Sequence, residues 1–287
     1  MEKDIKKILQ WIKNYETGQG DLTTESVSPY PIHSSGKLIM LANGVFSGRE
    51  IIEQLFEDYS DQLNLDWRKE EGAEIQGNDI IFEFEGNGAI VLNYSRIIEW
   101  IVGRMSGIAG ATREAVNFFN KVGKSLNASH SVFSMCREFD DLAFQTGGGI
   151  VNSTPFSDRM YIAQNHISYS GEISKVIKNV NQELNDAREV IKIEVEVNSY
   201  EEFVEANKND IDRIHLVNMS KQGIRDVFEK GNPNKKPILH LRDMNEWQEE
   251  YRDYFFRHCT VGNLIQNSKD VECKIYFDND GTKELKK

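Results

Sequence analysis

Apolar residues at helical spacing open the chain, and short apolar runs follow them. Ile5, Ile8 and Ile12 fall on one face of a predicted amphipathic helix over residues 2–14. The pattern then predicts a strand at residues 37–42 and a helix at residues 48–59. This half of the chain is therefore expected to mix helices and strands.

A turn sequence and a long apolar segment come next. Gly86-Asn87-Gly88 lies between two apolar runs and predicts a hairpin of residues 79–85 with residues 89–93. The long helix that follows carries apolar residues from Ile97 to Ala109. Its three glycines lower helix propensity, so they indicate close packing against a neighbouring segment; they are Gly103, Gly107 and Gly110.

From about residue 128 strands and helices alternate. Short apolar strands are predicted near residues 130–136, 159–163, 191–197, 213–219, 237–241 and 259–262. The clearest helix between them covers residues 172–188. Such alternation implies parallel strands with right-handed crossovers, in a doubly wound sheet or in a barrel shorter than the common eight-stranded one. A last strand, at residues 272–277, follows this region and is a candidate to return to the N-terminal domain.

Composition limits the class of protein. The 287 residues suffice for two domains, and 46 acidic against 34 basic residues give a formal net charge of −12. This charge disfavours nucleic acid and anionic membranes as partners, and no apolar run reaches the roughly 18 residues of a membrane span. The three cysteines form no CxxC motif or disulfide framework, so we expect a cytoplasmic protein; they are Cys136, Cys259 and Cys273.

The most informative strand is predicted at residues 191–197. Side chains alternate across a strand, so Lys192, Glu194 and Glu196 share one face and the apolar residues share the other. In a parallel α/β layer these carboxylates point into a barrel interior or toward the carboxyl ends of the strands, where ligand sites lie. The alternative is an antiparallel edge strand with one wet face.

Other candidates carry weaker signals. Arg213 and His215 share a strand face, although a lone strand histidine is more often structural. Gly147-Gly148-Gly149 is a candidate anion cradle or else a flexible loop, and His166 ends a predicted strand within a polar cluster. The sequence has no Walker loop, GxGxxG, HExxH or GxSxG motif.

Several segments, in order, resemble the quinolinate phosphoribosyltransferase family, the carboxylating nicotinate-nucleotide pyrophosphorylases. The resemblance extends from about residue 16 to residue 277. The matching segments are Gly20-Asp21-Leu22-Thr23-Thr24, Ala42-Asn43-Gly44-Val45-Phe46-Ser47-Gly48, Arg96, Arg104-Met105-Ser106-Gly107-Ile108-Ala109, Gly147-Gly148-Gly149, Asn165-His166-Ile167, Ile193-Glu194-Val195-Glu196-Val197, Asn218-Met219-Ser220 and Val261-Gly262.

The resemblance implies an α/β fold made of an α+β sandwich and an incomplete α/β barrel. The sandwich would cover residues 1–115 and be completed by a strand at 270–278, with a parallel barrel of about six or seven strands over residues 116–269. It also implies a homodimer, in which one sandwich covers the barrel mouth of the partner. Family members join quinolinate to 5-phosphoribosyl 1-diphosphate with Mg²⁺, and they release pyrophosphate and CO₂ to give nicotinate mononucleotide.

The resemblance also implies site residues. Glu194 and Glu196 would be catalytic, and they are the candidates for holding Mg²⁺. Arg96 would reach the neighbouring subunit's site. The further substrate-binding residues would be His130, Arg137, His166, His215 and Arg242, and the phosphate-binding residues Gly147, Gly148, Gly149 and Gly262.

The sequence departs from the family at several polar positions. Two family motifs that are rich in cations fall on Ser129-His130-Ser131 and Val151-Asn152-Ser153. A lysine of the family falls on Ala163, and an aspartate falls on Val217. The family's Ser-Gly-Gly loop falls on Leu241-Arg242-Asp243. A charge-assisted bond contributes about 1.5–3 kcal/mol, so these losses should abolish useful affinity for the family's substrates unless other cations substitute. The nearby candidates are His130, Arg137, Arg159 and Arg242.

Three functions remain open, all with a small-molecule site at the barrel mouth. The first is a diverged phosphoribosyltransferase-like enzyme that acts on a less anionic pyridine- or nucleotide-like ligand. The second is an inactive homologue that binds a ligand or a partner subunit. The third is the family's own reaction with relocated cations. Retention of Glu194 and Glu196 favours the first over the second, because unpaired buried carboxylates are costly.

Overall fold

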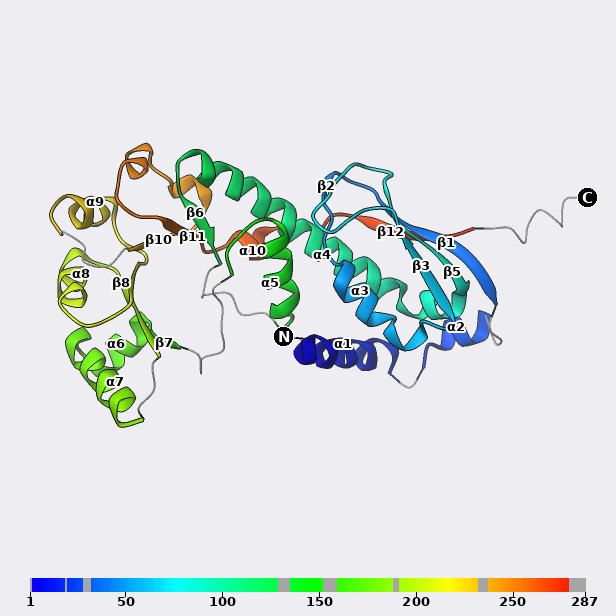
Figure 1. Cartoon of the computed structure of the whole chain (residues 1–287), viewed down its shortest axis with the longest axis horizontal. Helices are drawn as coiled ribbons and strands as arrows, with labels where there is room; N and C mark the ends of the chain where they lie inside the picture. The colour runs from blue at the N-terminus through cyan, green and yellow to red at the C-terminus, as the bar shows by residue number, and fades with distance from the viewer. Residues whose placement is uncertain are drawn as a thin grey trace, which may run out of the picture. The chain divides into compact units, whose positions relative to one another are not determined.

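The computed structural model describes residues 2–18, 20–27, 32–128, 135–151, 159–187, 191–231 and 237–278 (Figure 1). The chain divides into two compact units. The first comprises Met1–Glu114, Phe133–Gly148 and Ile265–Lys287, and the second Ala115–Val132 and Gly149–Leu264.

The first unit is built on a four-stranded antiparallel sheet. Its strand order is β12 (Cys273–Phe277), β1 (His33–Met40), β5 (Ile80–Asn87) and β3 (Leu63–Trp67). The C-terminal strand β12 pairs with β1 through the register Leu38 opposite Ile275, which confirms the predicted return of the last strand to the N-terminal part of the chain. Leu38 is fully buried and Ile275 nearly so, and this burial fixes the register.

The helices of this unit include α1 to α3 and α5. Their bounds are Glu2–Thr17, Leu22–Val27, Arg49–Leu55 and Arg137–Thr146. The short elements are β2 (Gly44–Val45), η1 (Glu57–Tyr59) and β4 (Glu74–Ile75). Helix α4 runs over 34 residues, Gly88–Lys121, and contains the boundary between the two units.

The predicted hairpin at Gly86-Asn87-Gly88 is wrong. Strand β5 ends at Asn87, and α4 begins at Gly88. The run Ala89–Asn93 has a length and apolarity that suit a strand or a buried helix equally. The helix forms because buried Ile90 and Val91 continue the apolar stripe of Ile97 and Ile101.

The glycines of α4 allow a close approach, as their pattern predicts. A Cβ on Gly107 would lie 2.2 Å from the carbonyl oxygen of Lys269, and one on Gly103 would lie 2.9 Å from that of Val271. The Val271 N–H donates a 2.9 Å hydrogen bond to the Gly103 carbonyl. Gly110 has no comparable neighbour, since its nearest atom would be 3.9 Å away.

The second unit is built on a parallel sheet of six strands. Their order is β6 (Ser125–Asn127), β11 (His258–Val261), β10 (Ile238–Leu241), β9 (Arg213–Leu216), β8 (Lys192–Val197) and β7 (Arg159–Ile162). Every neighbouring pair is parallel. Within the described ranges no pairing joins β6 to β7, so the sheet is open between these two strands.

The strand predicted near residues 130–136 falls mostly outside the described part, which omits residues 129–134. The described strand before it is β6, which ends at Asn127. Met135 and Cys136 form a turn before α5, so Cys136 is not on a strand as expected.

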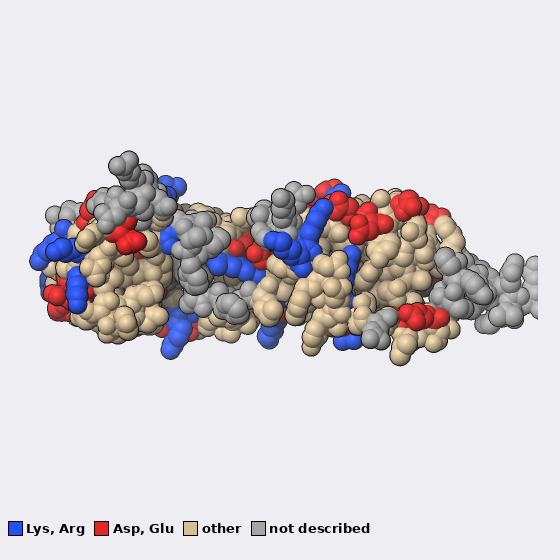
Figure 2. Space-filling view, turned by 90° about the horizontal axis from the view of Figure 1, so that it is seen from below, with Lys and Arg blue, Asp and Glu red and all other residues tan. Residues whose placement is uncertain are grey.

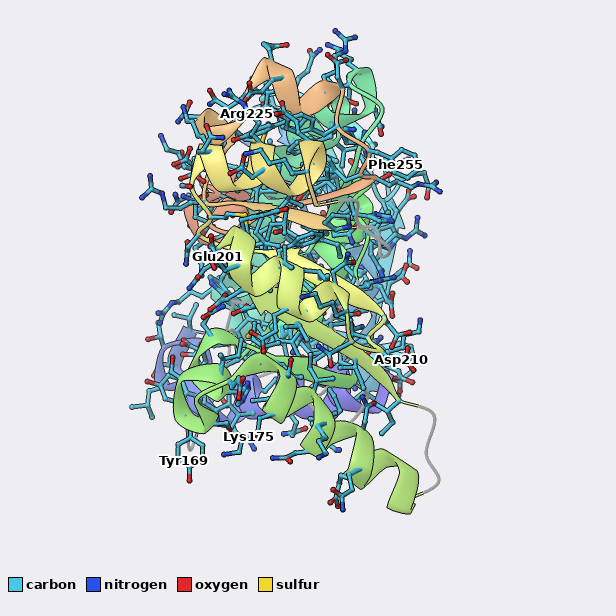
Figure 3. The ribbon with its side chains drawn as sticks, turned by 90° about the vertical axis from the view of Figure 1, so that its left-hand side faces the viewer. Tyr169, Lys175, Glu201, Asp210, Arg225 and Phe255 are labelled. Carbon is cyan, nitrogen blue, oxygen red and sulfur yellow. The ribbon has the colours of Figure 1, made fainter. Side chains whose placement is uncertain are left out.

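Helices cover one face of the parallel sheet (Figure 3). They are α6 (Gln164–Ser170), α7 (Ile173–Ala187), α8 (Tyr200–Asn207) and α9 (Lys221–Glu229). Ser199 and Ser220 cap α8 and α9 by accepting hydrogen bonds from the backbone N–H groups of Glu202 and Gly223. The remaining short elements are η2 (Met244–Glu246), η3 (Glu249–Arg252) and α10 (Leu264–Asn267).

The surface carries both charge signs. Figure 2 shows acidic and basic side chains interspersed over the described part of one face. Among the helices in the described ranges, none combines the length and apolar character that crossing a bilayer requires.

Candidate functional site

Polar side chains line the face of the parallel sheet that lies opposite its helices. Strand β8 lies between β7 and β9, so the edge-strand alternative for residues 191–197 is wrong. Ile193, Val195 and Val197 are buried on one face of β8, while Glu194 contacts polar residues of the two neighbouring strands. Alternation along this strand therefore predicted the face of Glu194 correctly.

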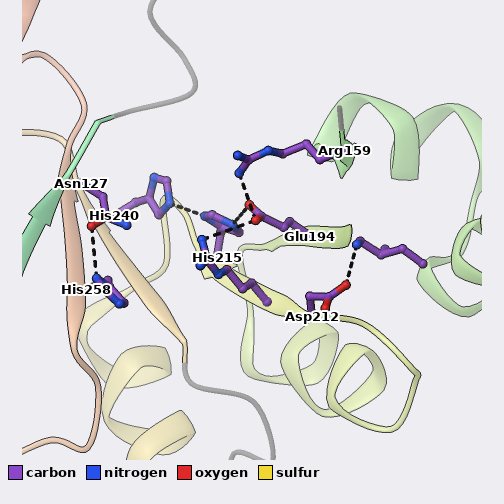
Figure 4. Close-up of polar contacts among 9 residues, drawn as sticks. Asn127, Arg159, Glu194, Asp212, His215, His240 and His258 are labelled. Carbon is purple, nitrogen blue, oxygen red and sulfur yellow. Dashed lines mark hydrogen bonds and ion pairs between the residues drawn. The ribbon is translucent and has the colours of Figure 1, made fainter. Parts of the chain in front are cut away.

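Glu194 is the centre of this site (Figure 4). Its side chain is 0% exposed, and its Oε1 lies 3.0 Å from Nη1 of Arg159 and 3.5 Å from Nη1 of Arg213. Oε2 lies 2.9 Å from Nε2 of His215. Burial alone would raise the pKa of Glu194, but the hydrogen bond from His215 and the charges of His215, Arg159 and Arg213 lower it to about 2. Glu194 is therefore ionised at neutral pH.

Glu196 is held by uncharged donors. Its Oε1 accepts a 2.8 Å hydrogen bond from the Tyr161 hydroxyl, and its Oε2 accepts a 3.1 Å bond from the backbone N–H of Gln164. Burial, followed by the charge and hydrogen bond of Glu196, raises the pKa of Tyr161. The phenol therefore keeps its proton and donates a hydrogen bond to Glu196.

Two further histidines lie on the next strands of the same sheet. Nδ1 of His215 is 2.7 Å from Nε2 of His240 on β10, and Nδ1 of His258 on β11 is 3.1 Å from Oδ1 of Asn127. His240 and Tyr161 do not belong to the predicted site. The alternation of Leu239, His240 and Leu241 within a predicted strand is the signal that could have found His240.

The carboxylates of this site do not fit Mg²⁺. Magnesium needs oxygen ligands in near-octahedral geometry, yet Oε1 of Glu194 pairs with Arg159, its Oε2 is hydrogen-bonded to His215, and both oxygens of Glu196 accept hydrogen bonds. In the described part of the chain no three His, Cys, Asp or Glu side chains come together as a set that could hold a metal. We therefore assign no metal to Glu194 or Glu196.

The other predicted substrate-binding residues lie in several places. Arg242 follows β10 and lies 3.4 Å from Oε1 of Glu246 and 3.8 Å from Oδ2 of Asp243. His166 lies in the first turn of α6, where its Nδ1 accepts a hydrogen bond from the Ala163 N–H. Arg137 belongs to the first unit and lies 3.7 Å from Asp141. His130 lies outside the described residues.

Two of the predicted phosphate-binding glycines have visible structural roles. A Cβ on Gly147 would lie 2.5 Å from Cβ of Thr112, so this glycine allows α5 to end against α4. Gly148 has a φ of 96°, in the region that favours glycine. Gly149 is the first residue of the Gly149–Leu264 segment of the second unit. Gly262 follows β11, and its N–H donates a 2.8 Å hydrogen bond to the Leu241 carbonyl.

Arg96 lies in the first unit beside two cavities of about 440 and 480 Å³. Its side chain is 85% exposed and lies 3.4 Å from Glu16.

The first cavity is lined by aromatic residues that include Trp11, Tyr15 and Trp100. The second is lined by the Gly20–Thr24 segment, in which Asp21 accepts hydrogen bonds from Thr23 and Thr24. The hydrogen bonds from Thr24 lower the pKa of Asp21.

The two domains of one protein family match the chain. The quinolinate phosphoribosyl transferase N-terminal domain matches residues 21–106, and the C-terminal domain of the same family matches residues 108–241. The chain belongs to the quinolinate phosphoribosyltransferase family. The resemblance of its ordered segments to this family is thus confirmed.

Relatives of this family match most of the chain. A protein of Bacillus subtilis named as a probable nicotinate-nucleotide pyrophosphorylase (carboxylating) is 27% identical over 98% of this chain and 96% of its own. A Methanocaldococcus jannaschii protein of the same name is 27% identical over 94% of this chain and 95% of its own. The fold agrees with the crystal structure of the Ehrlichia chaffeensis nicotinate-nucleotide pyrophosphorylase, with a TM-score of 0.84 at 20% identity over 95% of this chain and 98% of that one.

Proposed function

We propose that this family member is a diverged phosphoribosyltransferase-like enzyme whose ligand is pyridine- or nucleotide-like and less anionic than the family's substrates. The site would lie at the carboxyl ends of the parallel strands. The observation that carries the proposal is that Arg159 and His215 both bind Glu194, a carboxylate of the chain itself.

The electrostatics of the site support a weakly anionic ligand. Arg159 was a candidate to replace a lost family cation. A substrate that took Arg159 away from Glu194 would, however, leave this buried carboxylate with one positive charge fewer beside it. Removing one partner of a buried ion pair costs about 3–5 kcal/mol. A new charge-assisted bond to the substrate contributes only about 1.5–3 kcal/mol, so the exchange is unfavourable. Arg242 has acidic neighbours in Asp243 and Glu246.

The family's own reaction is the second candidate. The full-length match to relatives named as probable nicotinate-nucleotide pyrophosphorylases favours it. It requires that cations other than Arg159 and Arg242 hold the carboxylates and the diphosphate. The third candidate, an inactive homologue, predicts that none of the family's ligands is turned over.

We infer that two copies of the chain pair through the first unit, with Arg96 contributed to the partner's site. Three large aromatic residues stay exposed there: Trp11 by 49%, Tyr15 by 74% and Trp100 by 38%. The rings of Trp11 and Tyr15 stack with centroids 5.4 Å apart, and these residues line a cavity together with Arg96. Exposed apolar patches of this kind mark protein interfaces, and aromatic residues are enriched in interface cores.

Calorimetry tests the choice of ligand. Nicotinate has one carboxylate fewer than quinolinate, so we expect it to bind more tightly to this protein, and tighter binding of quinolinate would contradict the proposal. Glu194→Gln would release Arg159 and should increase the affinity for quinolinate. Glu229→Gln, at the exposed end of α9, is the matched control that should change neither affinity. Failure of both pyridines to bind would favour the inactive homologue.

A further inference from the structure

Gln164 is the first residue of α6, and it is bonded to β8 and α8 by three hydrogen bonds. Its backbone N–H donates a 3.1 Å bond to Oε2 of Glu196. Its side-chain Nε2 donates to the carbonyl oxygen of Glu196 at 3.2 Å and to Oε2 of Glu202 at 2.8 Å. Gln164 therefore joins the carboxylate and the main chain of Glu196 to the first turn of α8.

The chemistry of these partners fixes the orientation of the Gln164 amide. A carbonyl oxygen only accepts hydrogen bonds, and so does an ionised carboxylate. The amide nitrogen must therefore face Glu196 and Glu202, because a flipped amide would place its oxygen against two acceptors. Its two N–H groups match the two acceptors in number.

A capping sequence places Glu202 within reach of Gln164. Residues 199–202 read Ser-Tyr-Glu-Glu, which has the S-x-x-E pattern of a capping box. The Ser199 hydroxyl accepts a 3.2 Å bond from the Glu202 N–H, as in that motif. The Glu202 carboxylate reaches one residue further back than usual, since its Oε2 accepts a 2.9 Å bond from the Asn198 N–H. This carboxylate is therefore held beside the segment that joins β8 to α8.

These contacts close a ring of hydrogen bonds at the carboxyl end of β8. Strand β8 ends at Val197, and Asn198 follows it directly. Gln164 binds the Glu196 carbonyl, and Glu202 binds both Gln164 and the Asn198 N–H. The main chain is thus held on both sides of Val197. Rotation of the backbone that carries the Glu196 side chain would break at least one of these bonds.

The ring is partly shielded from water, which strengthens its bonds. Gln164, Glu196 and Glu202 are half-buried. A second glutamine makes the same kind of bond at an exposed surface, where Nε2 of Gln222 donates to Oδ1 of Asp226 at 2.9 Å along α9. Gln222 therefore provides a chemically matched comparison for Gln164.

We propose that Gln164 is a positioning residue for Glu196, with Glu202 as its anchor. The amide of Gln164 fixes the main chain at the end of β8, and its backbone N–H fixes one oxygen of the Glu196 carboxylate. The Tyr161 hydroxyl binds the other oxygen. The carboxylate is thereby kept in one orientation at the mouth of the parallel sheet, and Gln164 acts on a ligand through Glu196.

This role rests on the proposed function, since it requires a ligand at the carboxyl ends of the strands. The positioning itself can be tested without one, by amide hydrogen exchange measured residue by residue with NMR. Gln164→Glu keeps the length of the side chain but replaces the N–H donor with oxygens that repel Glu202. We expect the Asn198 amide to exchange at least about tenfold faster in this variant, because its acceptor is no longer held.

Amides inside the β8 ladder, such as that of Val195, should keep their exchange rates in Gln164→Glu. Gln222→Glu is the matched control, because it places a new carboxylate beside Asp226 and should leave the Asn198 rate unchanged. Combining Gln164→Glu with Glu202→Gln reverses donor and acceptor at constant net charge, and this double variant should restore slow exchange at Asn198.

Three results would overturn the positioning role. They are an unchanged Asn198 rate in Gln164→Glu, equally faster exchange along the whole of β8, and a double variant that exchanges as fast as the single one. If Gln164→Glu does not fold, Gln164→Met carries the test, since it removes the amide without adding charge, and an unchanged Asn198 rate in it would equally refute the role.

Calorimetry with nicotinate connects the positioning to binding. Gln164→Met should weaken the affinity at least about tenfold, as does loss of an outer partner that orients a metal ligand, while Gln222→Glu should not change it. An unchanged affinity in Gln164→Met would refute the action of Gln164 on the ligand. Failure of the wild type to bind nicotinate counts against the proposed function, and the exchange rates still decide the positioning.

Discussion

The Tyr161 hydroxyl donates a 2.8 Å hydrogen bond to Oε1 of Glu196, across the register between β7 and β8. Glu196 lies one inward-facing layer closer to the carboxyl ends than Glu194. Because Tyr161 and the Gln164 N–H hold it, this carboxylate has a fixed orientation at the mouth of the sheet. Glu194 and Glu196 thus differ in their partners: arginines and a histidine bind the first, and neutral donors bind the second.

Tyr161→Phe should destabilise the protein and loosen Glu196. A hydrogen bond to a charged group contributes about 1.5–3 kcal/mol, and Glu196 keeps its bond from Gln164, so we expect a loss near the lower end of this range. Urea unfolding measures it. Tyr169→Phe, which removes the hydroxyl of a tyrosine that is 94% exposed, is the control and should cost nothing measurable. Equal effects of the two variants would contradict the role of the Tyr161–Glu196 bond.

Glu194 should make stability depend on pH in the acidic range. Its pKa is lowered from the ordinary value of 4.5 to about 2 in the folded protein. A lowered folded-state pKa adds stability that is fully present above about pH 4.5 and disappears as the pH falls toward 2. Glu194→Gln should therefore cost about 3–5 kcal/mol at neutral pH.

The difference between wild type and Glu194→Gln should shrink steadily as unfolding is measured at lower pH. Glu229→Gln serves again as the control, because its carboxylate is exposed on α9. A difference that stays constant across the acidic range would show that the substitution acts through packing rather than through the charge of Glu194.

Two glycines of α4 should respond to alanine in opposite ways. A Cβ on Gly107 would overlap the Lys269 backbone at 2.2 Å, whereas one on Gly110 would meet nothing within 3.8 Å. Overpacking costs about 1–3 kcal/mol, and alanine in place of glycine within a helix gains up to about 1 kcal/mol. Thermal unfolding should therefore show a lower Tm for Gly107→Ala and an equal or higher Tm for Gly110→Ala. The opposite order would refute the close approach at Gly107.

The aromatic surface around Trp11 should control the oligomeric state. Light scattering is expected to give the mass of a dimer for the wild type and of a monomer for Trp11→Glu, since a buried charge opposes association. Tyr276→Glu, on β12 and 45% exposed, is the matched control and should remain a dimer. A monomeric wild type, or a dimer that tolerates Trp11→Glu, would contradict this interface.

Local patterns predicted most of the parallel sheet but not the partners within it. Alternation along residues 191–197 placed Glu194 on the correct face, because side-chain period is a property of one strand. The pairing of Glu194 with Arg159 depends on the register between β7 and β8, which no single segment contains. For the same reason no local pattern indicates that His215 and His240 are in contact.

The predicted hairpin at Gly86-Asn87-Gly88 failed for a related reason. These residues favour a turn locally, but the segment after them belongs to α4, whose apolar stripe extends as far as Ile101 and beyond. The tertiary packing of a 34-residue helix outweighs the turn preference of three residues. The separate assignment of residues 1–115 and 116–269 to two domains remains a prediction.

Product analysis tests the central claim most directly. The purified protein is incubated with quinolinate, 5-phosphoribosyl 1-diphosphate and Mg²⁺, and nicotinate mononucleotide is sought by mass spectrometry. A catalytically active family enzyme under the same conditions is the positive control. We expect no product above the sample without protein, because Arg159 and His215 are bound to Glu194 rather than open to an anionic substrate. Formation of nicotinate mononucleotide would contradict the account and assign the family's own reaction to this chain.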